Sequence, residues 1–501
     1  TAYTGDAIEV RKTVASVTST QDIGFDSNGD LDTASLLSFV GVGNDGFVSK
    51  WYDQSGNGDN ASQVSASAQP QIVSSGSVIL ENGKAAIEFD GSNDFFDAAS
   101  VTTGNPKSIF ISSKFASVSA SEKVIFDSTT TNQSILYKGT SNAIALGFGT
   151  FTFTSYTATT DYVLYSILNN GTNSNAYINS GQILTNTNLG TNAFNGLRIG
   201  AVRGTANLFY NGLISEFIVY GADQSANRTD IESNINSFYN MYWDGSQTGL
   251  LDDYPSASAA YSLRALNSAY TGPAIKVRKT VASVTSTQNI GFLYDGDLDT
   301  ASLLSFAGSN DVFISTWYDQ SGQSNDTTQS TASSQAKIVE SGSLIFKGSK
   351  ITTKFSGAQN YPIGSSVVNF ASSPSIFCLA SANGTQDLVY NLSDGTNFTT
   401  FGNTITSGHI ANRTSSGSKS LPQSLGINTI NSNILSDESY FNTVQNTGTQ
   451  NTRATTATNS LSLSGSFDLD GTIQEFILYN SDQSSNRTDI ETNINTYYTI
   501  Y

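Results

Sequence analysis

The chain has 501 residues, a formal net charge of −18 and a charged share of only 13%. Such an acidic surface repels nucleic-acid phosphates and anionic lipid, so neither is expected as a partner. No apolar run approaches the roughly 20 residues that span a bilayer, so no membrane insertion is expected. With one cysteine, Cys378, and one histidine, His409, the chain can form neither an internal disulfide nor a Cys/His zinc site.

The sequence contains an internal repeat of two copies. Trp51–Gly56 reads Trp-Tyr-Asp-Gln-Ser-Gly and returns unchanged as Trp317–Gly322. The run Leu31–Phe39 stands before the first copy, and it returns as Leu298–Phe306 before the second. We therefore expect two modules of about 250 residues, each long enough to bury a core of its own.

The repeat also predicts the domain boundaries. We predict module 1 at residues 1–243, a linker at residues 244–258 and module 2 at residues 259–501. The linker is too short for the modules to tumble freely, which predicts a semi-fixed tandem. The text from Thr1 onward matches the text from Ser268 onward, so the lead-in of the second copy has no counterpart in the first. We expect the chain to be a fragment for this reason.

Each copy opens with a strand and a short helix. Ala7–Arg11 alternates apolar and polar residues, as Ala274–Arg278 does, and this alternation predicts a strand. Asp32 stands directly before residues 33–40, where it can act as the N-cap of a helix. Phe47–Tyr52 predicts the strand that runs into the repeated motif.

The rest of each copy predicts a β-sandwich that ends in a helix. From Ser108 to Tyr220, short strands are separated by Asn-Gly and Gly-Thr turns at a spacing of about 8 to 12 residues. Gly212–Tyr220 is the last of these strands. Residues 226–239 carry one apolar stripe at helical spacing, which predicts a helix that docks on the sandwich.

Three stretches of the first copy carry a resemblance to known families. The opening block through Trp51–Gly56 and on to Gln63 resembles the N-terminal part of the catalytic domain of fungal α-L-arabinofuranosidase B enzymes. Phe89–Phe95 and Gly212–Tyr220 resemble the concanavalin A-like, or laminin G-like, jelly-roll sandwich. The resemblance implies an all-β fold of two tandem jelly-roll β-sandwiches, each with a short N-terminal helix and a C-terminal helix.

The same resemblance implies glycan contact, but it does not support hydrolysis. The enzymes line their substrate pocket with an adjacent cysteine pair, whereas this chain has only Cys378. Their catalytic carboxylates have no matching positions here. The chain also resembles tandem modules of marine bacterial surface proteins and of phage fibre or decoration proteins. That likeness implies an extracellular, cell-surface or virion-surface location, with neighbouring subunits of a larger assembly as partners.

Carboxylates present in both copies are the candidates for catalysis, because glycosidic cleavage needs two of them about 5 to 10 Å apart. The four candidates are Asp53, Asp319, Glu216 and Glu475. Asp53 precedes a Gln-Ser-Gly turn, where an aspartate normally accepts hydrogen bonds from backbone N–H groups. Glu216 has the strand parity of Ile214 and Ile218, so it faces either a concave sheet surface or an outer face under the helix.

An acidic turn is the candidate metal site. Asp26, Asn28, Asp30 and Asp32 have the alternate-residue spacing of a calcium loop. The turn lacks the glycine and the terminal glutamate of an EF-hand, and helix capping explains Asp32 without a metal. Calcium is therefore the one cofactor considered, and both interpretations stay open.

Aromatic side chains are the candidates for stacking on a sugar. Trp51 and Trp317 lie beside the repeated motif, where a core position is favoured. Tyr156, Tyr162 and Tyr210 lie in or beside turns of the first module. Tyr162 opens an apolar strand, which favours core packing for it.

The sequence as a whole favours a non-enzymatic tandem of β-sandwich modules for adhesion or structural display. It would bind a polysaccharide or surface glycan through edge loops or a concave sheet. Two alternatives stay open: a glycoside hydrolase related to arabinofuranosidases, and a purely structural filament or capsid-decoration subunit. The repeated motif is predicted to be a corner of the fold, in which Asp53 and Asp319 tie the following turn.

Overall fold

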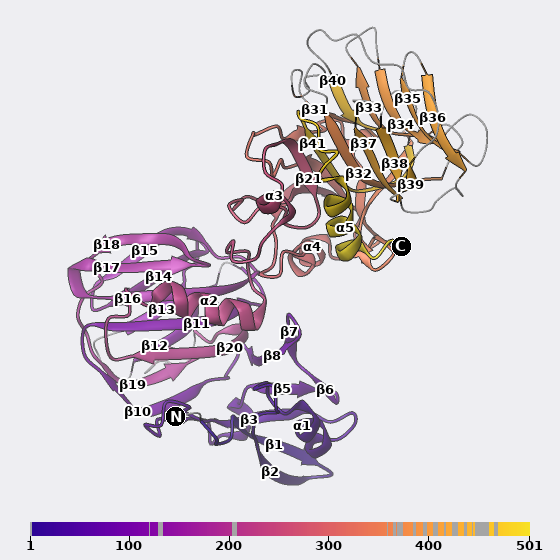
Figure 1. Ribbon diagram of the computed structural model, residues 1–501. Coiled ribbons are helices and arrows are strands. Elements are labelled where there is room, and N and C mark those ends of the chain that lie inside the picture. Colours follow the sequence, from indigo (N-terminus) through magenta and orange to yellow (C-terminus); the bar gives the residue numbers. More distant parts are fainter. Residues whose placement is uncertain are drawn as a thin grey trace. The chain divides into compact units, whose positions relative to one another are not determined.

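The computed structural model divides into two compact units, Thr1–Tyr242 (unit 1) and Trp243–Tyr501 (unit 2), and each is all-β in its framework (Figure 1). The structure describes residues 3–119, 121–128, 134–202, 208–357, 359–363, 367, 374–383, 387–393, 398–403, 409–414, 417–422, 429–434, 438–442, 444–445, 460–464 and 469–501. Among these residues, no helix is long and apolar enough to cross a membrane. The all-β sandwich prediction is confirmed.

The first sheet of unit 1 is antiparallel throughout. In spatial order its strands are β2 (Val17–Ile23), β1 (Ile8–Val14), β3 (Gly46–Trp51), β5 (Gln71–Ser74), β9 (Ile87–Asp90), β20 (Asn211–Tyr220), β11 (Lys107–Phe115), β16 (Tyr162–Asn169), β17 (Ser174–Ile178) and β18 (Gly181–Thr187). Short pieces flank it: β6 (Ser77–Val78), β7 (Leu80–Glu81), β8 (Lys84–Ala85), η1 (Ala66–Ala68) and η2 (Gly171–Asn173).

The second sheet of unit 1 lies against the first. Its strands are, in order, β4 (Ala61–Ser62), β10 (Phe96–Thr103), β19 (Phe194–Ile199), β12 (Lys123–Ser128), β13 (Ser134–Lys138), β14 (Ala143–Phe148) and β15 (Phe151–Thr157). Strand β4 also pairs with β3, which joins the two sheets. Alternate residues of both sheets, such as Ile109 of β11 and Leu146 of β14, meet in one buried core.

Two helices complete unit 1. Helix α1 (Thr33–Val40) begins where predicted, because the Asp32 side chain accepts a hydrogen bond from the Ser35 backbone N at 2.9 Å. Helix α2 (Arg228–Tyr239) lies across β11 and β16 on the outer face of the first sheet (Figure 1). There it buries Ile235 against Phe110 and Leu164.

Unit 2 repeats this plan. Its first sheet runs β23 (Val284–Ile290), β22 (Ile275–Val281), β24 (Val312–Trp317), β26 (Lys337–Glu340), β30 (Thr353–Gly357), β41 (Leu469–Tyr479), β32 (Ser375–Ala382), β37 (Thr429–Ile434), β38 (Glu438–Phe441) and β39 (Val444–Gln445). Its second sheet runs β31 (Tyr361–Ile363), β40 (Ser460–Leu463), β33 (Leu388–Ser393), β34 (Phe398–Asn403), β35 (His409–Thr414) and β36 (Gly417–Pro422). The short elements are β25 (Thr327–Thr328), β27 (Ser343–Leu344), β28 (Phe346–Lys347), β29 (Lys350–Ile351) and η3 (Ala332–Ser334).

Unit 2 contains one strand that the described part of unit 1 does not repeat. Strand β21 (Ala257–Ser262) pairs with β41 along the stretch that β30 leaves free. Helix α4 (Thr300–Ala307) is the counterpart of α1, and helix α5 (Arg487–Tyr498) is the counterpart of α2.

Residues 244–258, the segment predicted to be a linker, fold onto unit 2. They contain helix α3 (Leu250–Asp253) and the start of β21. Leu250 and Leu251 are buried in the same apolar cluster as Ile477 and Ile490. The segment therefore contributes to the packing of unit 2, because its apolar side chains have a core to enter.

The cap of α4 gives a test of this local structure. Asp299 accepts hydrogen bonds from the Ser302 N and Oγ atoms at 2.9 and 2.6 Å. Asp299→Ala should lower the free energy of unfolding by about 1 kcal/mol, measured by urea denaturation of the full chain. Asp299→Asn is the matched control, because asparagine caps a helix about as well, and it should unfold close to the natural midpoint. Equal losses in both variants would show that the cap is not what Asp299 contributes.

Candidate functional site

The repeated motif forms a tight, self-bonded turn in both units. In unit 1, Asp53 accepts hydrogen bonds from Ser55 N and Oγ, both at 2.8 Å, and from Asp59 N at 3.0 Å. In unit 2, Asp319 makes the same three bonds, at 2.9, 2.7 and 2.9 Å. Burial acts to raise the pKa of Asp53, but the hydrogen bonds outweigh it and lower the pKa. The predicted turn-tying role is confirmed for both aspartates.

Glu216 lies on the outer face of the sheet, under helix α2. A β-bulge between Ser112 and Ser113 of the neighbouring β11 shifts the register of β20. The prediction that Glu216 shares a face with both Ile214 and Ile218 is therefore wrong for Ile214. Ile214 enters the core, while Glu216 and Ile218 face the helix. Burial raises the pKa of Glu216 to about 7, and a hydrogen bond from the Tyr239 hydroxyl opposes the rise. Burial is thus the main cause of the raised pKa of Glu216.

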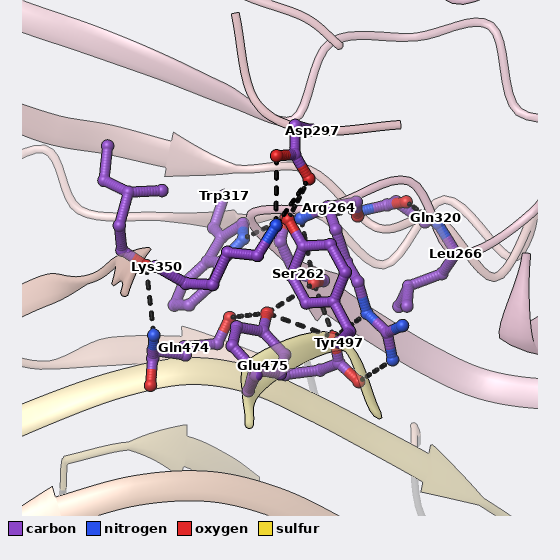
Figure 2. A network of polar contacts seen from close by, with 12 residues as sticks. Ser262, Arg264, Leu266, Asp297, Trp317, Gln320, Lys350, Gln474, Glu475 and Tyr497 are labelled. Carbon is purple, nitrogen blue, oxygen red and sulfur yellow. Dashed lines mark hydrogen bonds and ion pairs between the residues drawn. The ribbon is translucent and has the colours of Figure 1, made fainter. Parts of the chain in front are cut away.

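Glu475, the counterpart of Glu216, is a buried structural anion (Figure 2). Its Oε2 lies 2.8 Å from Arg264 Nε, and its Oε1 lies 2.9 Å from Arg264 Nη2. Ser262 Oγ donates a further hydrogen bond at 2.7 Å. The Arg264 guanidinium also lies 4.7 Å from the Tyr497 ring centroid. Both oxygens of Glu475 are therefore occupied by a bidentate ion pair, the arrangement that a buried charge needs.

The candidate tyrosines are mainly core residues. Tyr162 is 6% exposed beneath α2, which confirms the core packing predicted for it. Tyr210 is fully buried, with Phe89 and Phe115 rings 5.9 and 5.2 Å away. Tyr156 is half-buried and packs against the same core. Burial removes the first two as sugar-stacking platforms and leaves Tyr156 little free ring surface.

The two tryptophans of the motif also pack in the core, as predicted. Trp317 is fully buried within the core of unit 2. Trp51 packs partly exposed against the core of unit 1, with its ring 6.3 Å from that of Phe96. The side chain of His409 lies outside the described residues.

The acidic turn does not gather a metal site. Asp26 Oδ1 accepts hydrogen bonds from Asn28 N and Asp30 N at 2.8 and 3.0 Å. Asp32 caps helix α1, and Asp30 forms an ion pair with Lys84 at 2.6 Å. No group of three metal-ligating side chains occurs among the residues that the structure describes. Backbone amides and Lys84 account for these carboxylates without a metal, and the calcium interpretation stays a prediction.

A surface that the sequence did not single out lies on the outer face of the second sheet of unit 1. Phe151 and Phe153 of edge strand β15 are 42% and 56% exposed. Tyr137 of β13 lies beside them, with its ring centroid 6.0 Å from that of Phe153. The register places Tyr137, Ala145 and Phe153 in one row across the sheet. We call Tyr137, Phe151 and Phe153 the aromatic patch.

Glycines under the patch hold its rings against the sheet. A Cβ atom on Gly147 would lie 2.9 Å from Phe151 Cδ1, and one on Gly139 would lie 2.9 Å from Phe153 Cε1. The rings occupy the space that these side chains would need, a cross-strand arrangement that protects glycine in a sheet. A Cβ atom on Gly147 would also lie 2.3 Å from the Thr150 carbonyl oxygen, so the close approach there involves the backbone as well as the ring.

Comparison with known families bears on the second unit. Residues 252–403 match the family model described as alpha-L-arabinofuranosidase B, catalytic. The matched segment includes the Trp317–Gly322 motif, so the resemblance noted in the sequence is supported there. The match covers less than half of the chain and does not by itself assign the chain to that family. No curated protein matches the chain significantly.

Solved structures are similar to the chain only at low identity and low TM-score. An arabinofuranosidase complexed with arabinofuranosyl-alpha-1,2-xylobiose has a TM-score of 0.37 and 14% identity, covering 50% of this chain and 65% of its own. Domains LG4-5 of the mouse laminin alpha1 chain have a TM-score of 0.23 and 9% identity, covering 80% and 90%. Domain 4 of a GH43 extracellular arabinanase from Geobacillus stearothermophilus, in complex with arabinotriose, has a TM-score of 0.23 and 15% identity, covering 36% and 81%. Values this low carry no inference about activity.

The two equivalent glutamates predict opposite effects of one substitution. The pKa of Glu216 is about 7 in the folded state, whereas its ordinary value, which applies to the unfolded chain, is 4.5. The folded state therefore binds more protons between these values, and its stability falls as the pH rises through this window. Glu216→Gln should raise the melting temperature at pH 8 and change it little at pH 4.5.

Glu475→Gln is the matched comparison for that experiment. It leaves Arg264 buried without its anion, so it should destabilise the protein at neutral pH by about 3 kcal/mol. Calorimetry of the full chain at both pH values measures the two effects. A fall in the melting temperature of the Glu216→Gln variant at pH 8 would contradict the assignment of Glu216 as an uncompensated acid.

Proposed function

We propose that the chain is a non-enzymatic, surface-displayed tandem of glycan-binding β-sandwich modules. The observation that carries this proposal is the aromatic patch, whose Phe151 and Phe153 rings are exposed on a sheet face. The C–H face of a sugar ring is apolar, so it stacks on an exposed aromatic ring and releases water from both surfaces. Exposed apolar surface of this kind otherwise destabilises a soluble protein, which favours a binding role.

The surroundings of the patch favour an extended, uncharged glycan. Ser155 and Thr157 of β15 are exposed beside the rings and can hydrogen-bond sugar hydroxyls. The patch lies on an open sheet face, which suits a polysaccharide chain better than a single small sugar. The net charge of −18 disfavours acidic polysaccharides. A neutral polysaccharide is therefore the proposed ligand class.

The contacts of three acids that the two copies share support binding without cleavage. Asp53 and Asp319 are engaged by their turns, and Glu475 is engaged by Arg264. Few oxidisable side chains, with one cysteine and one methionine, suit a location outside the cell or on a virion. The proposed function therefore includes display of the modules on a cell or virion surface, beside neighbouring protein subunits.

The patch gives a direct test. The Phe151→Ala, Phe153→Ala double variant should bind neutral polysaccharides such as arabinan or xylan at least about tenfold more weakly, a loss of ~1.4 kcal/mol. Isothermal titration or affinity electrophoresis measures the change. Phe346→Ala in unit 2 is the matched control, because Phe346 is 54% exposed and lies outside the patch. Wild-type protein that binds no polysaccharide, or a double variant that binds normally, would refute the proposal.

A second candidate function rests on the family match at residues 252–403, whose description is catalytic. If the chain is a glycoside hydrolase, it releases reducing sugar from arabinan or arabinoxylan, and Asp53→Asn or Glu216→Gln abolishes that release. We expect no release above the level of heat-denatured protein. Turnover that these substitutions abolish would overturn the non-enzymatic proposal in favour of this one.

A further inference from the structure

Lys107 lies inside the sandwich of unit 1, where a lysine is unusual. It stands at the start of β11, on the face of that strand that carries the core residues Ile109 and Ile111. Its side chain is fully buried, and its Nζ lies 4.7 Å from the centroid of the Phe148 ring and 5.7 Å from that of Phe194. An ammonium ion in this position is unfavourable, because it has lost its water.

In the described part of the chain, no carboxylate compensates this loss. Lys107 forms no ion pair there, and its Nζ donates hydrogen bonds to Asn169 Oδ1 at 3.1 Å and to Asn192 O at 2.7 Å. Burial lowers the pKa of Lys107 to about 8. At pH 7 about a tenth of the molecules therefore carry a free amine here, whose lone pair can act as a nucleophile.

Asn169 is the direct neighbour of Lys107 in the sheet. The register of β11 and β16 places the two residues opposite each other, although they are 62 residues apart in the sequence. Asn169 is 1% exposed. Because Lys107 Nζ contacts Oδ1, the oxygen bonded to the side-chain carbon Cγ, the nitrogen lies beside that carbon. The packing thus presents an amine to an amide in a buried site.

Two hydrogen bonds fix the orientation of this amide. Asn169 Nδ2 donates to Gly190 O at 2.9 Å and to Ser174 Oγ at 3.2 Å. Both partners accept a hydrogen bond from Nδ2, so the carbonyl side of the amide is the side that faces Lys107.

Unit 2 builds the same corner of the sandwich without a lysine. Ser108 and Ser375 are equivalent, because each hydroxyl donates to a backbone carbonyl at 3.0 Å and accepts from a glutamine N at 2.9 Å, ahead of the C-terminal helix of its unit. The residue before Ser375 is Pro374, which is buried in the position of Lys107. The fold alone therefore does not account for a lysine here.

We propose that Lys107 and Asn169 form an intramolecular isopeptide bond that joins β11 covalently to β16. The lone pair of Nζ attacks Cγ of Asn169, and an Nζ–Cγ bond forms. The Cγ–Nδ2 bond breaks, and Nδ2 takes up one proton from Nζ and leaves as ammonia. The reaction needs no oxidant, reductant or further reactant. Its product is a neutral amide, so the unfavourable buried charge is removed.

The placement of the two groups makes this reaction feasible in the folded chain. Well-oriented reacting groups reach effective molarities of about 10⁵ M or more. Asn192 O remains as the acceptor for the one N–H that Nζ keeps. The bond closes a loop that contains β12 to β15, and with them the aromatic patch. Strands β11 and β16 then cannot separate completely, whatever ligand the patch binds.

Mass spectrometry of the full chain tests the proposal directly. Wild-type protein, kept for several days at a pH near the Lys107 pKa of about 8 and then denatured, should weigh less than its sequence by one ammonia molecule. A protease digest should contain one branched peptide in which Lys107 is joined to Asn169. Lys107→Met and Asn169→Leu should each restore the mass of the sequence, because each removes one of the two reacting groups.

Lys138→Met is the matched control. Lys138 is also fully buried, and its Nζ also contacts an asparagine oxygen, Asn142 Oδ1, at 3.1 Å. Its Nζ donates as well to the carbonyl oxygens of Ser119 and Ser121, both at 2.7 Å, so each of its three protons has an oxygen acceptor. This variant should therefore keep the loss of one ammonia molecule.

The outcomes are separable from those of the glycan experiment, because the mass is measured without a ligand. Circular dichroism verifies that each variant is folded. A wild-type mass equal to that of the sequence, a loss of ammonia at any other residue, or conversion of Asn169 to aspartate would overturn the proposal.

Discussion

The buried ion pair between Arg264 and Glu475 is the constraint on which unit 2 depends. Removing two charges from water is unfavourable, and only the bidentate geometry with a further bond from Ser262 offsets it. Because Arg264 lies just beyond β21, the pair fixes that segment along β41 and holds Tyr261 in the core. Among the described residues of unit 1, no cation is paired with Glu216, the counterpart of Glu475.

Features set by short-range contacts were predictable from the sequence. The Asp319 turn and the Asp32 cap each use a side chain that bonds to amides a few residues away, so local residue types suffice to predict them. Strand alternation with regular turn signals likewise led to the all-β sandwich. Tyr162 could be placed in the core because it opens an apolar strand.

Features set by distant partners were not predictable in the same way. The parity of Glu216 depends on a bulge that exists only through pairing with β11. The acidic turn has the residue spacing of a calcium loop, but Asp30 forms an ion pair with Lys84, which lies 54 residues away in the sequence. The aromatic patch depends on the register that sets Phe151 opposite Gly147. The Phe-Thr-Phe alternation at residues 151–153 was the available sequence signal for the patch. It predicts a strand but does not show which face of that strand is exposed to solvent.

Among the described residues, no strand pairs with residues 216–220 of β20 on the side of β9, and this bears on the colloidal behaviour of the protein. Unpaired backbone groups on a sheet edge promote association between identical molecules. The net charge of −18 opposes that encounter by long-range repulsion. Added salt shortens the reach of this repulsion to about 3 Å at 1 M ionic strength. We therefore expect association between molecules to increase when salt or acid suppresses the surface charge.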